Sequence, residues 1–487
     1  MEPTRAAAVR ILAAVLIALA LFMGLWNLGG WLMNDDEGTY LYDAWRVSLG
    51  ELPYRDFFLS QTPLGIFLGA AAFKALGPTV GAARALSLAF ILASAVLIGL
   101  AARRFFGLSP VISLLAAAAF LFTKHVYFLG RTFMPDIPMV FFSTAALFYG
   151  LKAEAAVPGR KAAGPAFLFG IMAGLAALAK LNAALLLPGY GLFVFYSAAR
   201  RFDRLSAVLR KAALAAAGFV ISCGLPFGLM LATIPGAYAG TIGFHLAKET
   251  AAEPLFSLVF ARLGTFIGNH NYGLIPIAVA GMILARALKD RRRALVAALL
   301  LAAIVPVFLP GTFYLRYIVF AFVPLALFFG DGLRAFFAAG KMRPALLVLS
   351  AALMALTLAP SFSLSRLRAF DTGTRDLAAY VVANTAPGDI VFGDDPGINF
   401  LARRACPPGL VDVSGEMTRS GQITAAMIRE ECERTGVKLI LVETEGPAHH
   451  LKNLRDYETF EAYLRESFTL ATTARREFLG VEIWRRK

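Results

Sequence analysis

The sequence has little charge and little cysteine. Of its 487 residues only 16% are charged, while 58% are hydrophobic, which is more apolar surface than a water-soluble core encloses. The three cysteines, Cys223, Cys406 and Cys432, show no CxxC spacing and so indicate no zinc site. For Cys406 and Cys432, which lie in a more polar region, a disulfide and two free thiols are both open. The composition excludes an ordinary soluble enzyme and predicts a polytopic α-helical membrane protein.

The region after residue 360 also lacks a Gly-rich phosphate loop between a strand and a helix, so nothing there marks a nucleotide site. The net charge of +15 is unevenly distributed. Residues 1–360 hold 30 Lys+Arg against 14 Asp+Glu, and residues 361–487 hold 17 against 18, which sum to the totals of 47 and 32. Because the basic excess lies in the apolar part, it reports membrane topology and not nucleic-acid binding.

Apolar runs long enough to cross a bilayer recur along the first 360 residues. They lie at about 8–28, 82–102, 109–123, 136–151, 164–180, 182–199, 212–233, 272–287, 294–310, 313–330 and 344–360. The short run 109–123 and the ambiguous stretch 255–268 leave the expected number of transmembrane helices at about 11 to 13.

The charges beside these runs predict the orientation. Arg5 and Arg10 precede the first run and acids follow it, so the N-terminus is expected in the cytoplasm and the acids outside. Alternate connections are basic and fall on the cytoplasmic side: Arg103–Arg104, Arg160–Lys161, Arg200–Lys211, Lys289–Arg293 and Arg334–Arg343. An odd number of spans places the C-terminal region outside. A cleaved signal peptide is the alternative for the first run, but no small-residue cleavage site follows it.

Two regions outside the bilayer are predicted. The first external loop, residues 29–80, is expected to hold a short helix over 40–49 and an interfacial helix over 64–76. From residue 361 the apolar runs shrink to strand length at 389–393, 437–442 and 481–484, with helical stretches at 375–384 and 425–435. We therefore expect a transmembrane domain, 1–360, and a small α/β domain, 361–487. His449–His450 has no third ligand at a recognisable spacing and is interpreted as a solvated loop.

Charged residues gather on the predicted outer face. The adjacent carboxylates Asp35–Glu37 repel one another, so a cation, a proton or a polar substrate is expected to stabilise them. Asp136, between two prolines at the mouth of a helix, lies on the same side, as do Lys180 and Arg316. Simpler roles stay open: an exposed loop acid for Asp36, helix capping for Asp136, and snorkelling to the headgroups for Lys180 and Arg316.

A family resemblance joins these residues. The ordered motifs are Asp36-Glu37-x-x-Tyr40, Gly50–Asp56, Thr62–Gly65, Arg84 within Ala82–Leu86, Pro135–Pro138, Gly174–Lys180, and Arg316–Tyr317 with Pro324. This set resembles the membrane glycosyltransferases of the GT-C fold that use polyprenyl-phosphate-linked sugars. The nearest branches are similar to protein O-mannosyltransferases and to the bacterial aminoarabinose transferases that modify lipid A. The likeness covers most of residues 10–330, and Phe400–Arg404 is a weaker match in the tail domain.

The resemblance implies a reaction and its residues. It implies transfer of a monosaccharide, with inversion, from a polyprenyl-phosphate donor to an acceptor hydroxyl of a glycan, lipid or protein on the outer face of the bacterial inner membrane. Asp36 is the expected general base, and Glu37 and Asp136 are expected to orient the acceptor or to hold a divalent cation, with Asp36 and Asp136 as the candidate metal ligands. The expected substrate-binding residues are Tyr40, Tyr54, Arg55, Arg84, Lys180 and Arg316.

One departure from the family pattern concerns the donor's phosphate. Many relatives place a basic residue before the Pro-Leu of the first loop, where this chain has Gln61 and Thr62. Phosphate recognition then falls to one of the four basic residues named above or to a divalent cation.

Two other classes of protein compete with this prediction. A secondary transporter or lipid flippase would use the acids for protons or substrate, and a structural membrane subunit would need no such motifs. Transporters bury charge near the bilayer midplane, whereas here the apolar runs carry almost no mid-span charge and the acids gather at one interface. The sequence therefore favours the transferase.

Overall fold

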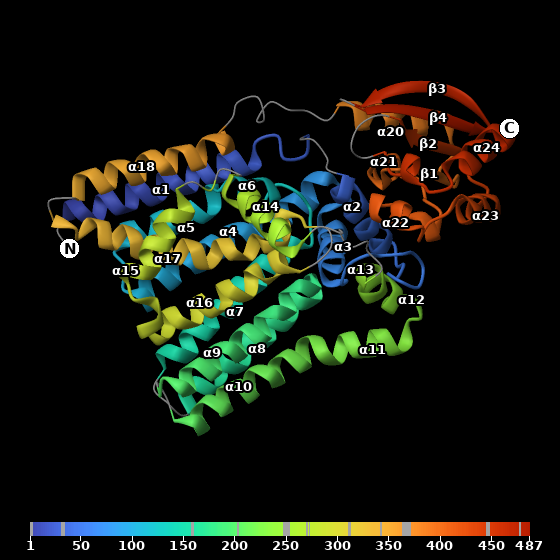
Figure 1. Cartoon of the computed structure of the whole chain (residues 1–487). Coiled ribbons are helices and arrows are strands. Elements are labelled where there is room, and N and C mark those ends of the chain that lie inside the picture. The colour runs from blue at the N-terminus through green and yellow to red at the C-terminus, as the bar shows by residue number, and fades with distance from the viewer. Residues whose placement is uncertain are drawn as a thin grey trace.

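The computed structural model describes most of the chain. The described residues are 3–30, 35–156, 160–201, 204–246, 254–268, 271, 273–309, 313–340, 343–362, 372–444, 449–476 and 479–487. They form a large helical part and, at the C-terminal end, a smaller unit built around one sheet (Figure 1).

The helical part runs from α1 to η8, where η marks 3₁₀ and π segments. Its elements are α1 (Pro3–Leu25), α2 (Asp35–Ser48), α3 (Leu64–Leu76), α4 (Val80–Phe106), α5 (Pro110–Phe122), α6 (Lys124–Leu129), α7 (Asp136–Ala155), α8 (Arg160–Ala179), η1 (Leu181–Leu185), α9 (Leu186–Ala199), α10 (Leu205–Phe219), η2 (Val220–Gly224), α11 (Leu225–Thr233), α12 (Gly236–Tyr238), η3 (Ala239–Gly243), α13 (Phe244–Leu246), α14 (Leu255–Gly268), α15 (Leu274–Leu284), η4 (Ala287–Lys289), α16 (Arg291–Ile304), η5 (Val305–Phe308), η6 (Leu315–Ala321), α17 (Phe322–Phe337), α18 (Arg343–Leu358) and η8 (Ala359–Phe362).

Several of these helices have the length and composition of membrane spans. Five of those that the structure describes qualify fully: Val80–Phe106, Ala162–Ala179, Leu181–Ala199, Leu205–Thr233 and Leu315–Phe337. Six shorter apolar helices accompany them. Leu225 and Leu229 in α11 are 62% and 65% exposed, as expected for a surface whose solvent is lipid. The prediction of a multi-pass membrane protein is confirmed, while the total of 11 to 13 spans stays a prediction.

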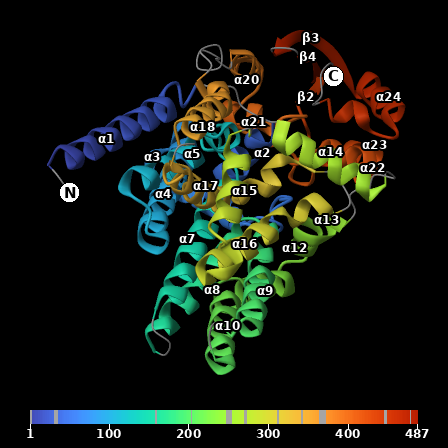
Figure 2. The same cartoon turned by 60° about the vertical axis from the view of Figure 1, so that its left-hand side comes forward.

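The basic connections meet at one end of the helical part. Buried Glu154, at the end of α7, pairs with Lys211 of α10 at 2.8 Å and with Arg291 of α16 at 3.0 Å. Arg292 donates a hydrogen bond to the carbonyl oxygen of Phe105, at the end of α4, at 2.9 Å. Both views place the start of α10 and the C-terminal unit at opposite ends of the molecule (Figure 1, Figure 2). This arrangement agrees with the predicted clustering of basic loops on one side.

The C-terminal unit is an α/β structure, as the strand-length runs predicted. Its elements are α20 (Thr372–Asn384), β1 (Val391–Gly393), α21 (Pro396–Ala402), η9 (Pro408–Leu410), α22 (Gly415–Ser420), α23 (Ala425–Thr435), β2 (Leu439–Glu443), η10 (Leu451–Asn453), α24 (Tyr457–Ser467), β3 (Phe468–Arg476) and β4 (Leu479–Arg486). The strand order is β1-β2-β4-β3, with β1 parallel to β2 and the other pairs antiparallel. The edge strand β3 was missed because most of its side chains face solvent and its sequence has no apolar run. The boundary near residue 360 stays a prediction.

The two external regions pack on each other. Helix α2 starts five residues before its predicted start, and α3 has the predicted bounds. Phe400 of α21 stacks on Phe73 of α3, with ring centroids 5.6 Å apart. The guanidinium of Arg403 lies over the rings of Phe400 and Trp45, at 4.5 and 5.4 Å, and donates to the carbonyl oxygen of Pro78. The C-terminal unit therefore sits directly on the first external loop.

Gly38 marks the closest approach between α2 and the C-terminal unit. A Cβ at this position would lie 2.3 Å from Oδ1 of Asp395 and 2.9 Å from the backbone of Gly397. We expect Gly38→Ala to weaken the docking by about 1–3 kcal/mol, because backbone and a hydrogen-bonded cap must move. The measurement is thermal unfolding of the purified protein together with protease protection of the C-terminal unit. Gly191→Ala in α9, where a Cβ meets open space, is the matched control and should leave both unchanged.

All three cysteines are buried free thiols. Cys406 and Cys432 are not joined by a disulfide, so the free-thiol alternative is the one observed. The backbone N–H of Cys406 donates to the hydroxyl of Tyr42 at 2.7 Å, which adds another link between the C-terminal unit and α2.

Candidate active site

Of the described carboxylates in the acidic segment, Asp36, in the first turn of α2, is the exposed one. It forms an ion pair with Arg316, the second residue of η6, although 280 positions separate them in sequence. The side chain of Asp36 is 43% exposed and that of Arg316 is 18% exposed. The guanidinium of Arg316 also lies 4.6 Å from the ring centroid of Tyr314. Asp36 is thus held by a cation and still accessible to a substrate. The side chain of Asp35 lies outside the described residues.

A second ion pair, fully buried, lies between Asp136 and Lys180. The ammonium of Lys180 is 2.7 Å from Oδ1 of Asp136 and 5.1 Å from the ring centroid of Tyr317. Oδ2 of Asp136 is buried and has no hydrogen-bond partner among the residues that the structure describes. Because Lys180 is only 5% exposed and contacts a carboxylate, it does not snorkel to the headgroups. No side chain caps the N-terminus of α7, so Asp136 is not observed in the capping role.

Breaks in the helices bring these groups together. Helix α8 ends at Ala179, and Lys180 itself has extended backbone angles, φ −156° and ψ 125°. Arg316 lies in a 3₁₀ segment that is kinked at Ile318. The interruptions thus fall at the two residues whose cations meet Asp136 and Asp36.

Tyr40 faces the same cluster. It lies one helical turn after Asp36, on the same face of α2, and is 5% exposed. Burial raises the pKa of Tyr40 well above its ordinary value, and the charges of Asp36, Arg316 and Asp136 all act on it. These interactions place five of the predicted residues, Asp36, Tyr40, Asp136, Lys180 and Arg316, in one cluster.

Three other predicted residues are engaged elsewhere. Glu37 and Arg84 are both fully buried and form a bidentate ion pair, with Nε–Oε1 at 2.7 Å and Nη2–Oε2 at 2.6 Å. Glu37 Oε1 also accepts from the backbone N–H of Phe133 at 2.7 Å, and Arg84 donates to the carbonyl oxygen of Leu28 at 2.8 Å. The pair fastens α2 to α4 and leaves neither side chain exposed. Arg55 is 58% exposed and pairs with its neighbour Asp56.

Tyr54 and the Gln61–Thr62 step organise the first external loop. Tyr54 has a positive φ of 66°, and its hydroxyl donates to the carbonyl oxygen of Gln61. Thr62 is 1% exposed and donates to the carbonyl oxygen of Ala177 in α8 at 3.0 Å. Both residues of the Gln61–Thr62 step are therefore tied into the fold.

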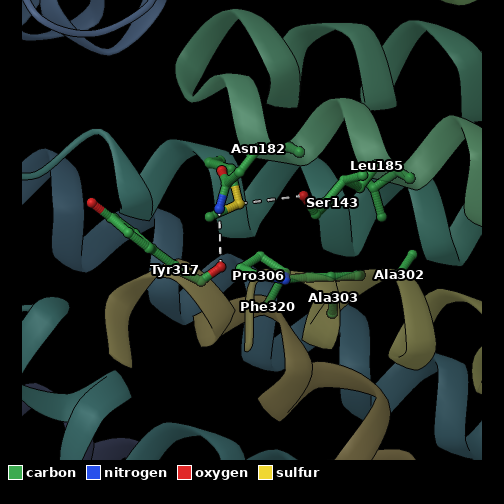
Figure 3. A pocket seen from close by; sticks show the side chains of 11 residues that line it. Ser143, Asn182, Leu185, Ala302, Ala303, Pro306, Tyr317 and Phe320 are labelled. Atoms are coloured by element: carbon green, nitrogen blue, oxygen red, sulfur yellow. Dashed lines mark hydrogen bonds between the residues drawn. The ribbon is translucent and has the colours of Figure 1, made fainter. Parts of the chain in front are cut away.

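A small cavity is lined by residues that follow Lys180 and Arg316 in sequence, among them Asn182 and Tyr317 (Figure 3). Its volume of about 20 Å³ holds roughly one water molecule. Asn182 and Ser143 line it, and the side-chain amide of Asn182 donates to the carbonyl oxygen of Tyr317 at 2.9 Å. Asn182 thereby supports the backbone of the segment that carries Arg316.

Sequence reasoning missed Asp43. It lies on the Asp36–Tyr40 face of α2, is fully buried, and neither of its carboxylate oxygens has a hydrogen-bond partner among the described residues. Burial raises its pKa well above the usual carboxyl range, and the charge of Asp412 raises it further. The i, i+4, i+7 spacing from Asp36 was the available signal.

The raised pKa of Asp43 predicts the pH dependence of stability. A carboxyl whose folded-state pKa exceeds its unfolded value lowers stability increasingly as pH rises from the unfolded pKa, about 3.9, toward the folded one. We therefore expect Asp43→Asn to raise the unfolding temperature by several degrees at pH 8 and by less at pH 5. Thermal unfolding at the two pH values checks this, and an equal change at both would contradict it.

The predicted metal site receives little support from the donor atoms. Asp36 and Asp136 are each paired with a cation. Among the described parts of the chain, no group of three or more His, Cys, Asp or Glu side chains gathers as metal ligands do.

The fold is shared with solved structures of ArnT and of an oligosaccharyltransferase. The chain has the GT-C membrane fold, which confirms the predicted fold class. ArnT from Cupriavidus metallidurans bound to undecaprenyl phosphate is similar over 97% of both chains, with a TM-score of 0.69 and 16% identity. The same protein in its apo state covers 98% of both chains, with a TM-score of 0.67 and 15% identity. The Archaeoglobus fulgidus oligosaccharyltransferase in complex with Zn and sulfate covers 88% of this chain and 68% of its own, with a TM-score of 0.55 and 14% identity.

A family model agrees with the fold. Residues 63–246 match the family described as dolichyl-phosphate-mannose-protein mannosyltransferase. No curated protein sequence matches the chain. The matched segment runs from the first external loop through α13 and includes Arg84, Asp136 and Lys180.

Proposed function

We propose that this protein is an integral-membrane glycosyltransferase that moves a monosaccharide from a polyprenyl-phosphate donor to an acceptor hydroxyl. The observation that carries the proposal is the polar cluster at one end of an otherwise apolar helical part. It combines an accessible carboxylate, Asp36, with two cations, Arg316 and Lys180, and a buried acid, Asp136. A reaction that removes a proton and releases a phosphate needs this combination.

The residues divide the reaction between them. Asp36 takes the proton from the acceptor hydroxyl as its oxygen forms a bond to the anomeric carbon. The bond from that carbon to the phosphate oxygen breaks on the opposite face, so the configuration inverts and polyprenyl phosphate leaves with the electron pair. Arg316 and Lys180 stabilise the growing phosphate charge. The free Oδ2 of Asp136 orients the acceptor.

Two residues of the predicted set receive different roles. Glu37 holds α2, and with it Asp36, through its pair with Arg84, and it does so without reaching substrate. Arg55 is exposed on the first external loop, where it meets charged groups that approach from the membrane surface. Tyr40 and Tyr54 line the donor's path.

An apolar groove suits the donor's isoprenoid chain. It has a volume of about 320 Å³ and lies between the first external loop and α11. Its lining includes Leu64, Phe67, Phe227 and Met230, and Tyr54 lies at its edge. An isoprenoid placed there stays in contact with lipid-facing helices while its phosphate reaches the polar cluster. The structurally similar ArnT binds undecaprenyl phosphate, a lipid of this chemistry.

The proposed location is the bacterial inner membrane. The basic residues at the α10 end face the cytoplasm by the positive-inside rule, and the polar cluster and the C-terminal unit lie in the periplasm. The clustering of Lys211, Arg291 and Arg292 at one end supports this orientation.

Reconstitution separates the transferase from a transporter or flippase. Purified protein in liposomes receives a radiolabelled polyprenyl-phosphate sugar together with an envelope fraction from cells that lack the gene. A transferase moves label into a new covalent product. A transporter or flippase moves label across the bilayer with the donor intact, and that result would overturn the proposal.

A further inference from the structure

One surface of the C-terminal unit carries polar groups that the proposed reaction does not use. It consists of Ser414, Glu416, Arg419 and His450, and we call it the polar wall. The first three belong to α22 and the residue before it, and His450 directly precedes η10. In both views α22 lies on the same side of the C-terminal unit as α23 (Figure 1, Figure 2), while the neighbouring α21 packs on α2 of the helical part.

The polar wall contains hydrogen-bonding atoms with no partner. Nδ1 of His450 and Oγ of Ser414 are buried, and neither has a hydrogen-bond partner among the described residues. A Cβ at Gly415 would lie 3.0 Å from His450 Nδ1 and 3.1 Å from an Arg419 nitrogen, so the glycine lets both side chains lie against the backbone. Native proteins rarely leave such atoms unpaired unless a water or ligand completes them.

Charged groups of the wall and of the proposed active site act on one another. The charges of Glu416 and Arg419 act on the hydroxyl of Tyr314, the residue whose ring carries the Arg316 guanidinium. The charge of Asp36 also reaches His450. The polar wall therefore lies within electrostatic range of Asp36 and Tyr314.

The charge of the wall indicates the ligand class. Glu416 and Arg419 neutralise each other across 3.9 Å. Burial lowers the pKa of His450 to about 4, so its imidazole is neutral at physiological pH. The wall thus offers donors and acceptors without net charge, which suits the hydroxyls of a sugar better than a phosphate.

We propose that the polar wall binds a neutral sugar unit of the acceptor and turns its hydroxyl toward Asp36. The inference rests on the proposed function, and it narrows the acceptor class from glycan, lipid or protein to a glycan. His450 and Ser414 supply the hydrogen bonds that now lack partners, and Arg419 and Glu416 bind neighbouring hydroxyls.

Kinetics with the full-length enzyme tests the wall. In the radiolabel assay, with the envelope fraction as acceptor, Arg419→Met and His450→Leu should each raise the KM for acceptor about tenfold, the loss of one good hydrogen bond. The KM for donor and the binding of undecaprenyl phosphate should stay unchanged. His450→Asn, which restores a polar atom near Nδ1, should recover part of the loss. Arg434→Met removes a matched i, i+3 pair with Glu431 on α23 and should have no effect.

A second measurement does not depend on turnover. A photo-crosslinking residue at Glu416 should give carbohydrate-containing adducts in intact cells, and one at Arg434 should not. Two results would overturn the inference: an unchanged KM for acceptor in both wall variants, or adducts at Glu416 that contain only lipid or protein. Sugar transfer that depends on Asp36 would still support the proposed function in either case. Glycan adducts at Glu416 in a protein that transfers no sugar would support glycan binding by the polar wall and would contradict the proposed transferase function.

Discussion

Asp36→Asn should lower kcat for sugar transfer by roughly 10²- to 10⁴-fold, the range for loss of a general base. Asparagine keeps the shape of the side chain but does not take the acceptor's proton. Since Asp36 is accessible and pairs with Arg316 at the end of the apolar helices, this change addresses the chemistry more directly than any other in the cluster. The measurement is the rate of label transfer by reconstituted protein at saturating donor.

Two comparisons make this result specific. Asp56→Asn alters a partly exposed acid of the same external region, which contacts Arg55 and the backbone N–H of Leu52, and should leave kcat unchanged. Arg316→Met removes the partner of Asp36 and, because it also loses a cation at the phosphate, should raise the KM for donor as well as lower kcat. Normal transfer by correctly inserted Asp36→Asn protein would show that another group is the base.

Glu37→Leu should destabilise the protein by about 3–5 kcal/mol, because it leaves the fully buried guanidinium of Arg84 without its counter-charge. The double variant Glu37→Leu with Arg84→Met should recover most of that loss, because an apolar pair of similar volume avoids the burial of an unpaired charge. Thermal unfolding and chemical denaturation of detergent-purified protein measure both effects.

An exposed ion pair provides the scale for comparison. Arg429 and Glu466 in the C-terminal unit are 52% and 61% exposed, so Glu466→Leu should change stability by less than about 1 kcal/mol. If Glu37→Leu costs no more than that, the buried pair does not fasten α2 to α4. Recovery of stability without recovery of transfer in the double variant would instead give Glu37 or Arg84 a part in the reaction.

The sequence predicted the fold class because its main signals are local. Apolar runs, basic connections and strand-length segments each depend on a few neighbouring residues, and they identified the membrane part and the α/β unit correctly. The strand β3 was not predicted, because the sequence of an exposed edge strand has no apolar pattern. The bounds of α2 shifted because its first turn is held by tertiary contacts, with Arg316 and Arg84, that no local pattern contains.

The candidate site was only partly predicted from the sequence, because its residues are brought together by tertiary contacts. Motif order pointed to Asp36, Asp136, Lys180 and Arg316, which the structure brings together. Motif order did not distinguish these four residues from Arg84, because only the fold shows that the Arg84 guanidinium is paired with Glu37. The sequence analysis interpreted His450 as part of a solvated loop. The structure buries its Nδ1 beside Gly415, because η10 packs against α22. The sequence of the first 360 residues does not indicate which side chains of the C-terminal unit pack near the site.

The contacts of α2 bear on how the protein is made. Three consecutive residues, Asp36, Glu37 and Gly38, meet η6, α4 and α21, which follow at widely different distances along the chain. The ribosome completes α2 early but supplies its last partner, Gly397, only after more than three hundred further residues, on the order of tens of seconds later. During that interval the side of α2 that packs on α21 has no partner. This face of α2 therefore lacks its last partner until the final fifth of the chain is being made.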